Sequence, residues 1–407
     1  MGRRLGRECL YVPSGRLGLL LALRHFCPPG GRVLMSPVND DVILFVVLAA
    51  GLRPVQAPLR TRDGTIDADA VPEETWRGLS AVLTTHLYGN PDPAPALRAR
   101  CDALGIPLLE DAAHAIGTAV GGRPAGTWGD AAAFSLSKHV HAHTGGFLAL
   151  ADPSPRAALA RARDDLLLPH RVGPELAYAV RPYAETVARR LRLTAAVWAA
   201  LRLVGLDDRP GDTIRMPLRE DALKEAVAAV APEAPPGDAL DAFDPWVRVD
   251  LRDYRVAGGR TRARRVARRF ARLDAVLDAH RAGTAKLLAT PWADPGAVER
   301  PLFRVPLLVA DRDRARAALA RERIAVGYLY DPPLDVYAGP AFTDASPAPG
   351  PAAWFARHAL PVDPLRADDV VRVLRAAGTE PAAVPAGGWP APPGDGPADG
   401  PARGAGD

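Results

Sequence analysis

Lysine is scarce in this chain, and one lysine lies where a reactive amine would be useful. The 407 residues contain three lysines, Lys138, Lys224 and Lys286, and arginine supplies almost every other cation. A guanidinium keeps its proton in proteins, whereas a lysine amine can lose it and attack a carbonyl carbon. Lys224 lies in a predicted helical run and Lys286 in the Ala/Thr/Leu stretch after a predicted helix, and both are predicted to be solvated. Lys138 directly follows the apolar run AAAFSLS, which predicts a position at the carboxyl end of a strand, where α/β sheets bind ligands.

A carboxylate ends another apolar run. In PLLEDAAHAIG, Asp111 ends a predicted strand, where a charge is costly unless it has a partner. A protonated heteroaromatic nitrogen would be such a partner, because the carboxylate would keep the ring cationic and able to accept electrons. His114, three residues later, would lie near Asp111 and could stack on that ring or bind its phenolic oxygen. The alternative is a helix-capping aspartate beside a structural histidine.

The segment PSGRLGLLLAL predicts a Ser-Gly turn that opens an apolar helix. Unpaired N–H groups and the positive end of the helix dipole suit a phosphate there. Gly15 would allow close approach, Arg16 would add charge, and Ser135 offers a further hydroxyl; a plain capping sequence is the alternative. His139, His141 and His143 alternate and could converge, but no carboxylate or cysteine with ligand spacing accompanies them, so no metal site is predicted.

Taken together and in this order, these segments resemble the DegT/StrS-type family of sugar aminotransferases. The resemblance runs from about Tyr11 to Gly378. Its most specific parts are THLYGNP at 85–91, LLEDAAHAIGTAVGGRPAGTWGDAAAFSLSK at 108–138, and the glycine pair Gly145 and Gly146. Further matches are Ile214-Arg215-Met216, RVPLLV at 304–309, the stretch 327–334 and ALPVDP at 359–364.

The resemblance implies a fold and a cofactor. The fold is the type I fold of pyridoxal-phosphate (PLP) transferases, an α/β fold with a large, mostly parallel seven-stranded sheet and a smaller C-terminal α/β domain. Lys138 would form the Schiff base with pyridoxal 5'-phosphate, Asp111 would contact the pyridine nitrogen, and His114 would stack on the ring. Phosphate contacts are expected from Gly15, Arg16 and Ser135, or from Ser137, because Ser135 stands nearer the lysine than the family's serine. Expected substrate contacts are Asn39, Asp40, His86, Tyr88, Arg215 and Tyr328.

The implied activity is amination of a ketone on a nucleotide-linked sugar, or of a related biosynthetic ketone, with an amino acid donor such as glutamate. The family implies a homodimer with shared active sites and a role in amino-sugar formation in secondary metabolism. A dehydratase or lyase reaction of the same family is the alternative, although Lys138 argues against those dehydratases that carry histidine instead. A non-catalytic PLP-binding regulator that docks through 191–206 is a third hypothesis.

Departures from the family pattern concern the substrate side. The family's Pro-x-x-Thr-aromatic segment appears as Pro37–Asp41, without the hydroxyl or the aromatic ring. Arg16 stands where the family's Ser-Gly-Thr turn has threonine, and the stretch 152–210 is longer than usual. The cofactor assignment is therefore better supported by the residues than the sugar assignment.

Composition excludes several other classes of protein. The chain is 48% hydrophobic, and its 51 basic and 47 acidic residues are interspersed without a sustained basic run, so no nucleic-acid partner is predicted. Cys9, Cys27 and Cys101 lie far apart, which favours a reducing cytoplasm. No stretch of about 18 apolar residues occurs, so no membrane span is predicted. The apolar stretch 191–206 is interrupted by arginines and suits a buried or interface helix better than a membrane surface.

The pattern predicts three regions: a large domain at 1–240 with a helical extension at 152–210, a small domain at 241–378, and a disordered Pro/Gly/Ala-rich tail at 379–407. Strands are predicted at 32–37, 54–58, 81–88, 107–111, 131–135, 147–151 and 302–309. Helices are predicted at 40–50, 94–104, 259–280, 311–323 and 368–377. The strands at 107–111, 131–135 and 147–151 lack long helices between them, so that part of the sheet need not follow a simple right-handed βαβ winding.

Overall fold

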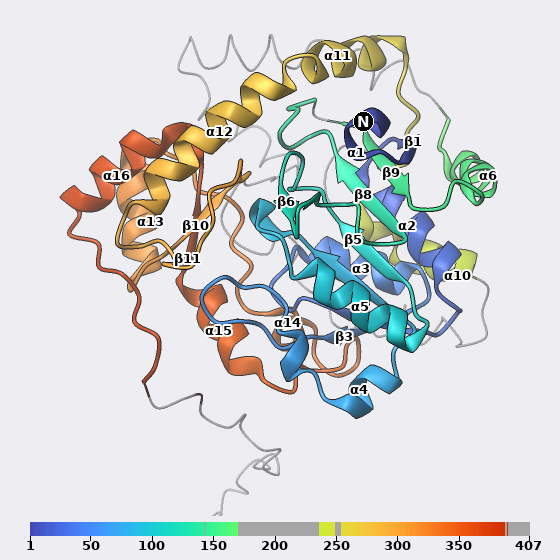
Figure 1. The fold of residues 1–407 in the computed structure, drawn as a ribbon, viewed down its shortest axis with the longest axis horizontal. Helices are drawn as coiled ribbons and strands as arrows, with labels where there is room; N and C mark the ends of the chain where they lie inside the picture. Colours follow the sequence, from blue (N-terminus) through green and yellow to red (C-terminus); the bar gives the residue numbers. More distant parts are fainter. Residues whose placement is uncertain (143, 170–235, 249–253, 387–388, 390–407) are drawn as a thin grey trace, which may run out of the picture.

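A seven-stranded sheet forms the centre of the larger part of the molecule (Figure 1). The computed structural model describes residues 1–142, 144–169, 236–248, 254–386 and 389. The strand order is β1-β9-β8-β5-β4-β2-β3. The strands are β1 (Glu8–Val12), β2 (Arg32–Met35), β3 (Arg53–Gln56), β4 (Ala81–Thr85), β5 (Leu108–Asp111), β8 (Ala131–Ser135) and β9 (Gly146–Leu150).

Five neighbouring strands, β3, β2, β4, β5 and β8, run parallel. The next strand, β9, runs antiparallel to β8, with Ser135 opposite Gly146, and β1 runs antiparallel to β9. The stretch 136–145 is too short for the crossover that parallel strands need, roughly a dozen residues or more. The carboxyl ends of β5 and β8 therefore meet at one edge of the sheet, and the loop that carries Lys138 begins there.

Helices cover both faces of this sheet. Alternate residues of β2 face opposite sides of the sheet. Val33 and Met35 belong to a core with α2 (Gly15–Phe26) and α3 (Asp41–Ala49), whereas Leu34 packs on the opposite side. On that opposite side lie α4 (Glu73–Arg77) and α5 (Ala94–Leu104).

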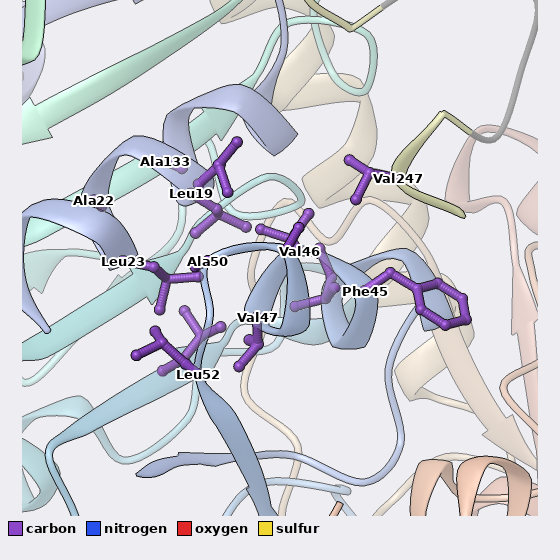
Figure 2. Packing of buried hydrophobic residues seen from close by; sticks show 14 of the residues in the cluster. Leu19, Ala22, Leu23, Phe45, Val46, Val47, Ala50, Leu52, Ala133 and Val247 are labelled. Atoms are coloured by element: carbon purple, nitrogen blue, oxygen red, sulfur yellow. The ribbon is translucent and has the colours of Figure 1, made fainter. Parts of the chain in front are cut away.

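Figure 2 shows how closely α2 and α3 pack in the first core. All nine residues of α3 are buried, because α10 (Pro236–Val247) covers its outer side.

A smaller α/β part lies beside the large sheet (Figure 1). Its strands β10 (Val305–Leu308) and β11 (Ala359–Val362) pair antiparallel. Its core is built with α12 (Leu273–Leu288), α13 (Arg312–Arg321) and α16 (Ala367–Ala376). Within the described residues, the remaining elements are α1 (Gly2–Leu5), β6 (Ala119–Val120), β7 (Arg123–Pro124), α6 (Arg156–Leu166), α11 (Arg260–Phe270), α14 (Leu334–Ala338), α15 (Pro349–His358) and three short 3-10 turns.

Three local predictions need correction. The single helix expected at 259–280 is two helices, because the helical conformation is interrupted at Ala271 and Arg272, between α11 and α12. The strand expected at 81–88 ends at Thr85, since Tyr88 has a positive φ of 58°. The tail does not begin at Thr379: the carbonyl of Glu380 accepts from Ala310, which fixes this segment beside β10.

Some predictions fall outside the described residues: most of the extension, the helix at 191–206, Lys224, Arg215 and the end of the tail. Lys286 is described; its amine lies 2.6 Å from the Asp368 carboxylate and its side chain is 55% exposed, as expected for a solvated lysine. Among the helices that are described, none combines the length and the apolarity that a membrane crossing requires.

Candidate active site

The sheet brings Asp111 and Lys138 to the same edge. Asp111 is the last residue of β5, paired with Ala133 of the neighbouring β8, and Lys138 follows β8. The Lys138 loop is held at its base, because Leu136 N–H donates to the carbonyl of Gly145 at 2.9 Å. The two side chains interact electrostatically, because the charge of Lys138 lowers the pKa of Asp111.

Burial is the largest influence on Asp111. It raises the pKa of this carboxyl from its ordinary value to about 6, against the charges of His86 and Lys138 and a bond from the backbone N–H of Ala113. That bond reaches Oδ1 at 3.0 Å. Within the described residues, Oδ2 accepts no hydrogen bond. The carboxyl is therefore largely buried with one hydrogen bond, to Oδ1, and a cationic partner would favour its charged form.

An aromatic cluster surrounds the amine of Lys138. Its Nζ lies 5.5 Å from the centroid of the Phe303 ring and 5.9 Å from that of Tyr328. The His114 ring stacks on Phe303 with a centroid distance of 5.0 Å and an angle of 23°. His114 Nδ1 also accepts from the backbone N–H of Tyr88 at 3.2 Å, which fixes its ring. The reactive amine thus lies among flat apolar surfaces that could enclose a planar ring.

Two serines and the start of α2 converge beside this amine. The side-chain oxygens of Ser135 and Ser137 are 2.8 Å apart. A Cβ placed on Gly15, the first residue of α2, would lie 3.6 Å from Cβ of Ser135. Ser14 caps the helix by accepting from Leu17 N–H at 3.2 Å. Hydroxyls and first-turn N–H groups therefore face one place, a suitable arrangement for a phosphate.

Arg16 is directed elsewhere. Its Nη1 donates to the carbonyl of Val247 at 2.7 Å, and its guanidinium lies 5.5 Å from the ring centroid of Tyr254. Its expected phosphate contact stays a prediction.

His86, an expected substrate contact, belongs to a buried ion network. Its Nε2 lies 2.9 Å from Oε2 of Glu110, and both side chains are fully buried. Burial lowers the pKa of His86, but the hydrogen bond and charge of Glu110 outweigh this and raise it. Burial raises the pKa of Glu110. The carboxylate accepts from the backbone N–H groups of residues 126, 128 and 129, and these bonds together with His86 bring the pKa of Glu110 below its usual value. A contact of His86 with substrate stays a prediction.

Among the other expected substrate residues that the structure describes, Asn39 and Asp40 follow β2 and Tyr88 follows β4. Asn39 donates to Thr85 Oγ1 at 2.9 Å, and Asp40 caps α3 through Val42 N–H. Tyr88 is buried and its hydroxyl donates to the carbonyl of Tyr328 at 2.8 Å. These contacts bring Tyr88 and Tyr328 to the Lys138 cluster.

The histidines after Lys138 do not form a metal centre in the described part of the chain. His139 is fully buried and its Nε2 lies 3.0 Å from the carbonyl of Pro301, while His141 has a positive φ of 52°. No group of three potential ligands is assembled among the residues that the structure describes. His143 lies outside them.

Sequence reasoning missed Phe303 and Arg304, which come from the smaller part of the molecule. Their backbone N–H groups donate to the carbonyl of Tyr88 at 2.8 and 3.1 Å. The Arg304 guanidinium lies 4.3 Å from the ring centroid of Phe303. In the sequence both lie at the start of the strand predicted at 302–309, and Arg304 begins the RVPLLV match, but neither signal indicated a distant partner.

Known proteins share both the sequence pattern and the fold. Residues 5–165 match the DegT/DnrJ/EryC1/StrS aminotransferase family. This confirms the resemblance seen in the sequence. The matched part contains Asp111, His114 and Lys138.

Two curated relatives illustrate the range within this family. A dTDP-3-amino-3,4,6-trideoxy-alpha-D-glucose transaminase from Micromonospora megalomicea subsp. nigra is 39% identical over 160 residues, 38% of this chain and 43% of that protein. GDP-perosamine synthase from Vibrio cholerae is 30% identical over 131 residues, 32% of this chain and 36% of that protein. The aligned parts thus span less than half of the length of these relatives.

The likeness of fold extends further than the likeness of sequence. The E. coli GDP-4-keto-6-deoxy-D-mannose-3-dehydratase with bound hydrated PLP superposes with a TM-score of 0.62, covering 92% of this chain and 89% of that one at 16% identity. This confirms the predicted fold class, with its mostly parallel seven-stranded sheet.

Proposed function

We propose that this protein is a PLP-dependent aminotransferase that aminates a ketone on a nucleotide-linked sugar, or a related biosynthetic ketone, with an amino acid such as glutamate as donor. The observation that carries the proposal is that the sheet brings Lys138 and the buried Asp111 to the same edge, where the charge of Lys138 lowers the pKa of Asp111. The relatives named above support the substrate class, because the names of both refer to nucleotide-linked amino sugars.

The residues present fit the cofactor. Asp111 has one carboxylate oxygen without a hydrogen-bond partner among the described residues and a pKa raised by burial, so a cationic ring nitrogen would relieve its desolvation. The cluster of Ser135, Ser137 and the first turn of α2 suits the phosphate. A Cβ on Gly146 would lie 2.4 Å from the carbonyl oxygen of Phe134 and 3.0 Å from Gly15 N, so the backbone packs closely behind this cluster.

Each residue would have a defined task. When bound, PLP supplies a conjugated ring that accepts the electron pair left when a substrate C–H bond breaks. Asp111 would hold a proton on the ring nitrogen. Lys138 would remove a proton from the carbon that carries the donor's nitrogen, acting as a base, and would later return a proton, acting as an acid. Its amine would be free to do so once the donor amine had taken its place. His114 would pack against the ring, and Tyr88 would hold His114 in position.

The test is spectroscopic. The PLP-loaded enzyme should absorb in the visible range through the link to Lys138, and Lys138→Ala should abolish both this absorbance and its sensitivity to borohydride. Lys286→Ala is the matched control, because its amine only pairs with Asp368 at the surface. Borohydride-sensitive colour that persists in Lys138→Ala would refute the assignment.

The reaction outcome is tested separately. A dehydratase or lyase reaction would use the same Lys138, so product analysis must decide between them. If no keto acid forms from any amino donor across nucleotide-linked keto-sugars, transamination fails.

Two further proposals concern the setting of the enzyme. A homodimer with shared active sites is proposed from the resemblance to the family, and light scattering would test it. A cytoplasmic location is supported by the three cysteines, all of which are free thiols in the structure.

A further inference from the structure

Two buried histidines hold the backbone just before Phe303. His139 lies in the loop between β8 and β9, and its Nε2 is 3.0 Å from the carbonyl oxygen of Pro301. His280 lies on α12, and its Nδ1 is 2.8 Å from the carbonyl oxygen of Leu302. Both side chains are fully buried. Two consecutive carbonyl groups are therefore fixed, one by the loop of the large sheet and the other by α12.

The two hydrogen bonds define where each ring carries its proton. A carbonyl oxygen only accepts, so His139 is protonated on Nε2 and His280 on Nδ1. The other nitrogens, Nδ1 of His139 and Nε2 of His280, are buried without a hydrogen-bond partner among the described residues. Burial is the largest influence on both rings; it lowers the pKa of His139 to about 3 and also lowers that of His280. Both imidazoles are therefore neutral at pH 7, each in one defined tautomer.

His139 also contacts the side chain of Phe303. The centroids of the two rings are 5.6 Å apart with an angle of 64° between the planes, an edge-to-face contact of the kind that aromatic pairs prefer. The ring of His280 lies 5.0 Å from that of His139. The two histidines thus fix the backbone that leads to Phe303, and His139 also orients its ring.

Phe303 in turn borders the reactive groups of the proposed site. Its ring centroid lies 5.5 Å from Lys138 Nζ, and its ring stacks on that of His114 at 5.0 Å. A shift of Phe303 would therefore displace the surface beside the amine and the support of His114 together. Displacements of about 1 Å matter at such a site, because reacting groups must be held in alignment.

We propose that His139 and His280 are positioning residues that together hold Phe303 against Lys138 and His114. The inference rests on the proposed function and extends it to two residues that lie behind the site, of which His280 is outside the matched region 5–165. Neutral imidazoles suit this task, because their hydrogen bonds stay the same above the usual histidine pKa of about 6.5.

Histidine-selective 15N labelling tests the tautomers in the cofactor-free protein, independently of the proposed function. Long-range 1H–15N spectra distinguish the Nδ1–H, Nε2–H and charged forms of each ring. At pH 7 the signals that disappear in His139→Gln should be those of an Nε2–H tautomer, and those that disappear in His280→Asn should be those of an Nδ1–H tautomer. A charged ring or the opposite tautomer at either position would overturn the inference.

Paired variants test the positioning itself. His139→Leu and His280→Leu remove the N–H donor, whereas His139→Gln and His280→Asn keep an amide N–H near the place of the lost ring nitrogen. Each Leu variant should lower the affinity for PLP about 5-fold, the ratio that corresponds to one lost hydrogen bond, and should weaken the visible circular dichroism of the bound cofactor. The Gln and Asn variants keep the bond and should stay within about twofold of the wild type.

His358→Leu is the matched control. Its Nδ1 lies 2.9 Å from the carbonyl oxygen of Val309, just after β10, and its ring contacts that of Trp354 at 4.9 Å. The control should lose unfolding free energy in urea, as the other two Leu variants do, but should leave PLP affinity and circular dichroism unchanged. If a Leu variant does not fold, the tautomer measurement still decides, because it needs only the wild type and the amide variants.

Four results would count against the inference. Unchanged PLP affinity and circular dichroism in both Leu variants, or an equal loss in His358→Leu, would leave the pair with a structural role only. Retention of added Zn²⁺ by the wild type, lost in both Leu variants, would assign the pair to a metal. Wrong tautomers with intact Lys138-dependent absorbance would refute this inference alone. Expected tautomers without that absorbance would refute the proposed function, and this inference with it.

Discussion

Because the carboxyl of Asp111 is buried, we expect the unfolding free energy of the cofactor-free protein to depend on pH. Its pKa is raised from 3.8 to about 6, chiefly by burial. The folded state therefore binds this proton more tightly than the unfolded chain does. The resulting stabilisation is complete below the unfolded pKa and is lost as the pH rises through about 6. Two pKa units correspond to about 3 kcal/mol.

Asp111→Asn removes this titration while keeping the shape and an acceptor for Ala113 N–H. Relative to the wild type, the variant should gain about 3 kcal/mol of unfolding free energy between pH 4 and pH 8. Urea unfolding of both cofactor-free proteins, followed by tryptophan fluorescence across that range, measures the change in the difference. Any constant cost of the amide cancels.

The control and the contrary result are clear. Asp278→Asn changes a carboxylate that is 73% exposed on α12 and should show no comparable trend. Parallel pH profiles for wild type and Asp111→Asn would refute the claim that this carboxyl is desolvated. Saturation with PLP should shrink the trend, because a cationic ring nitrogen would offset the cost of the buried charge.

Two other variants test the support of the site. Glu110→Gln leaves His86 without its anionic partner and should lower the unfolding free energy by about 3–5 kcal/mol; a loss below about 1 kcal/mol in urea unfolding would contradict the role assigned to this pair. Gly146→Ala would drive a methyl group against the Phe134 carbonyl and should cost about 1–3 kcal/mol and weaken PLP retention measured by dialysis. Gly296→Ala, whose Cβ meets only Asp294 at 3.4 Å, is the neutral comparison.

The local pattern of the sequence predicted most of the large sheet. The bounds expected for the strand 131–135 and the helix 94–104 coincide with β8 and α5. The helix ends on a strong local signal, the glycine after Leu104. β1 was missed, because its alternate residues are only partly buried and it lies at the edge of the sheet.

The candidate site divides in the same way. Lys138 and Asp111 could be predicted to lie close together because Asp111 ends one apolar strand and Lys138 follows another, and the carboxyl ends of parallel strands share one edge of a sheet. Phe303 and Arg304 could not, since their places depend on how two parts of the chain pack together. The same holds for His86, whose partner Glu110 lies on another strand and whose burial no local pattern indicated.

The β8–β9 hairpin has a consequence for engineering this protein. Its loop contains Lys138 and is anchored a second time where Gly145 N–H donates to the carbonyl of Pro13 at 2.7 Å, just before α2. The length of this loop therefore sets the distance between the Lys138 amine and the proposed phosphate site at Ser135, Ser137 and the first turn of α2. Adding or deleting one residue there would misalign both, whereas an insertion at Gly122, in the turn between β6 and β7, should be tolerated because an added Cβ there would meet no atom within 4 Å.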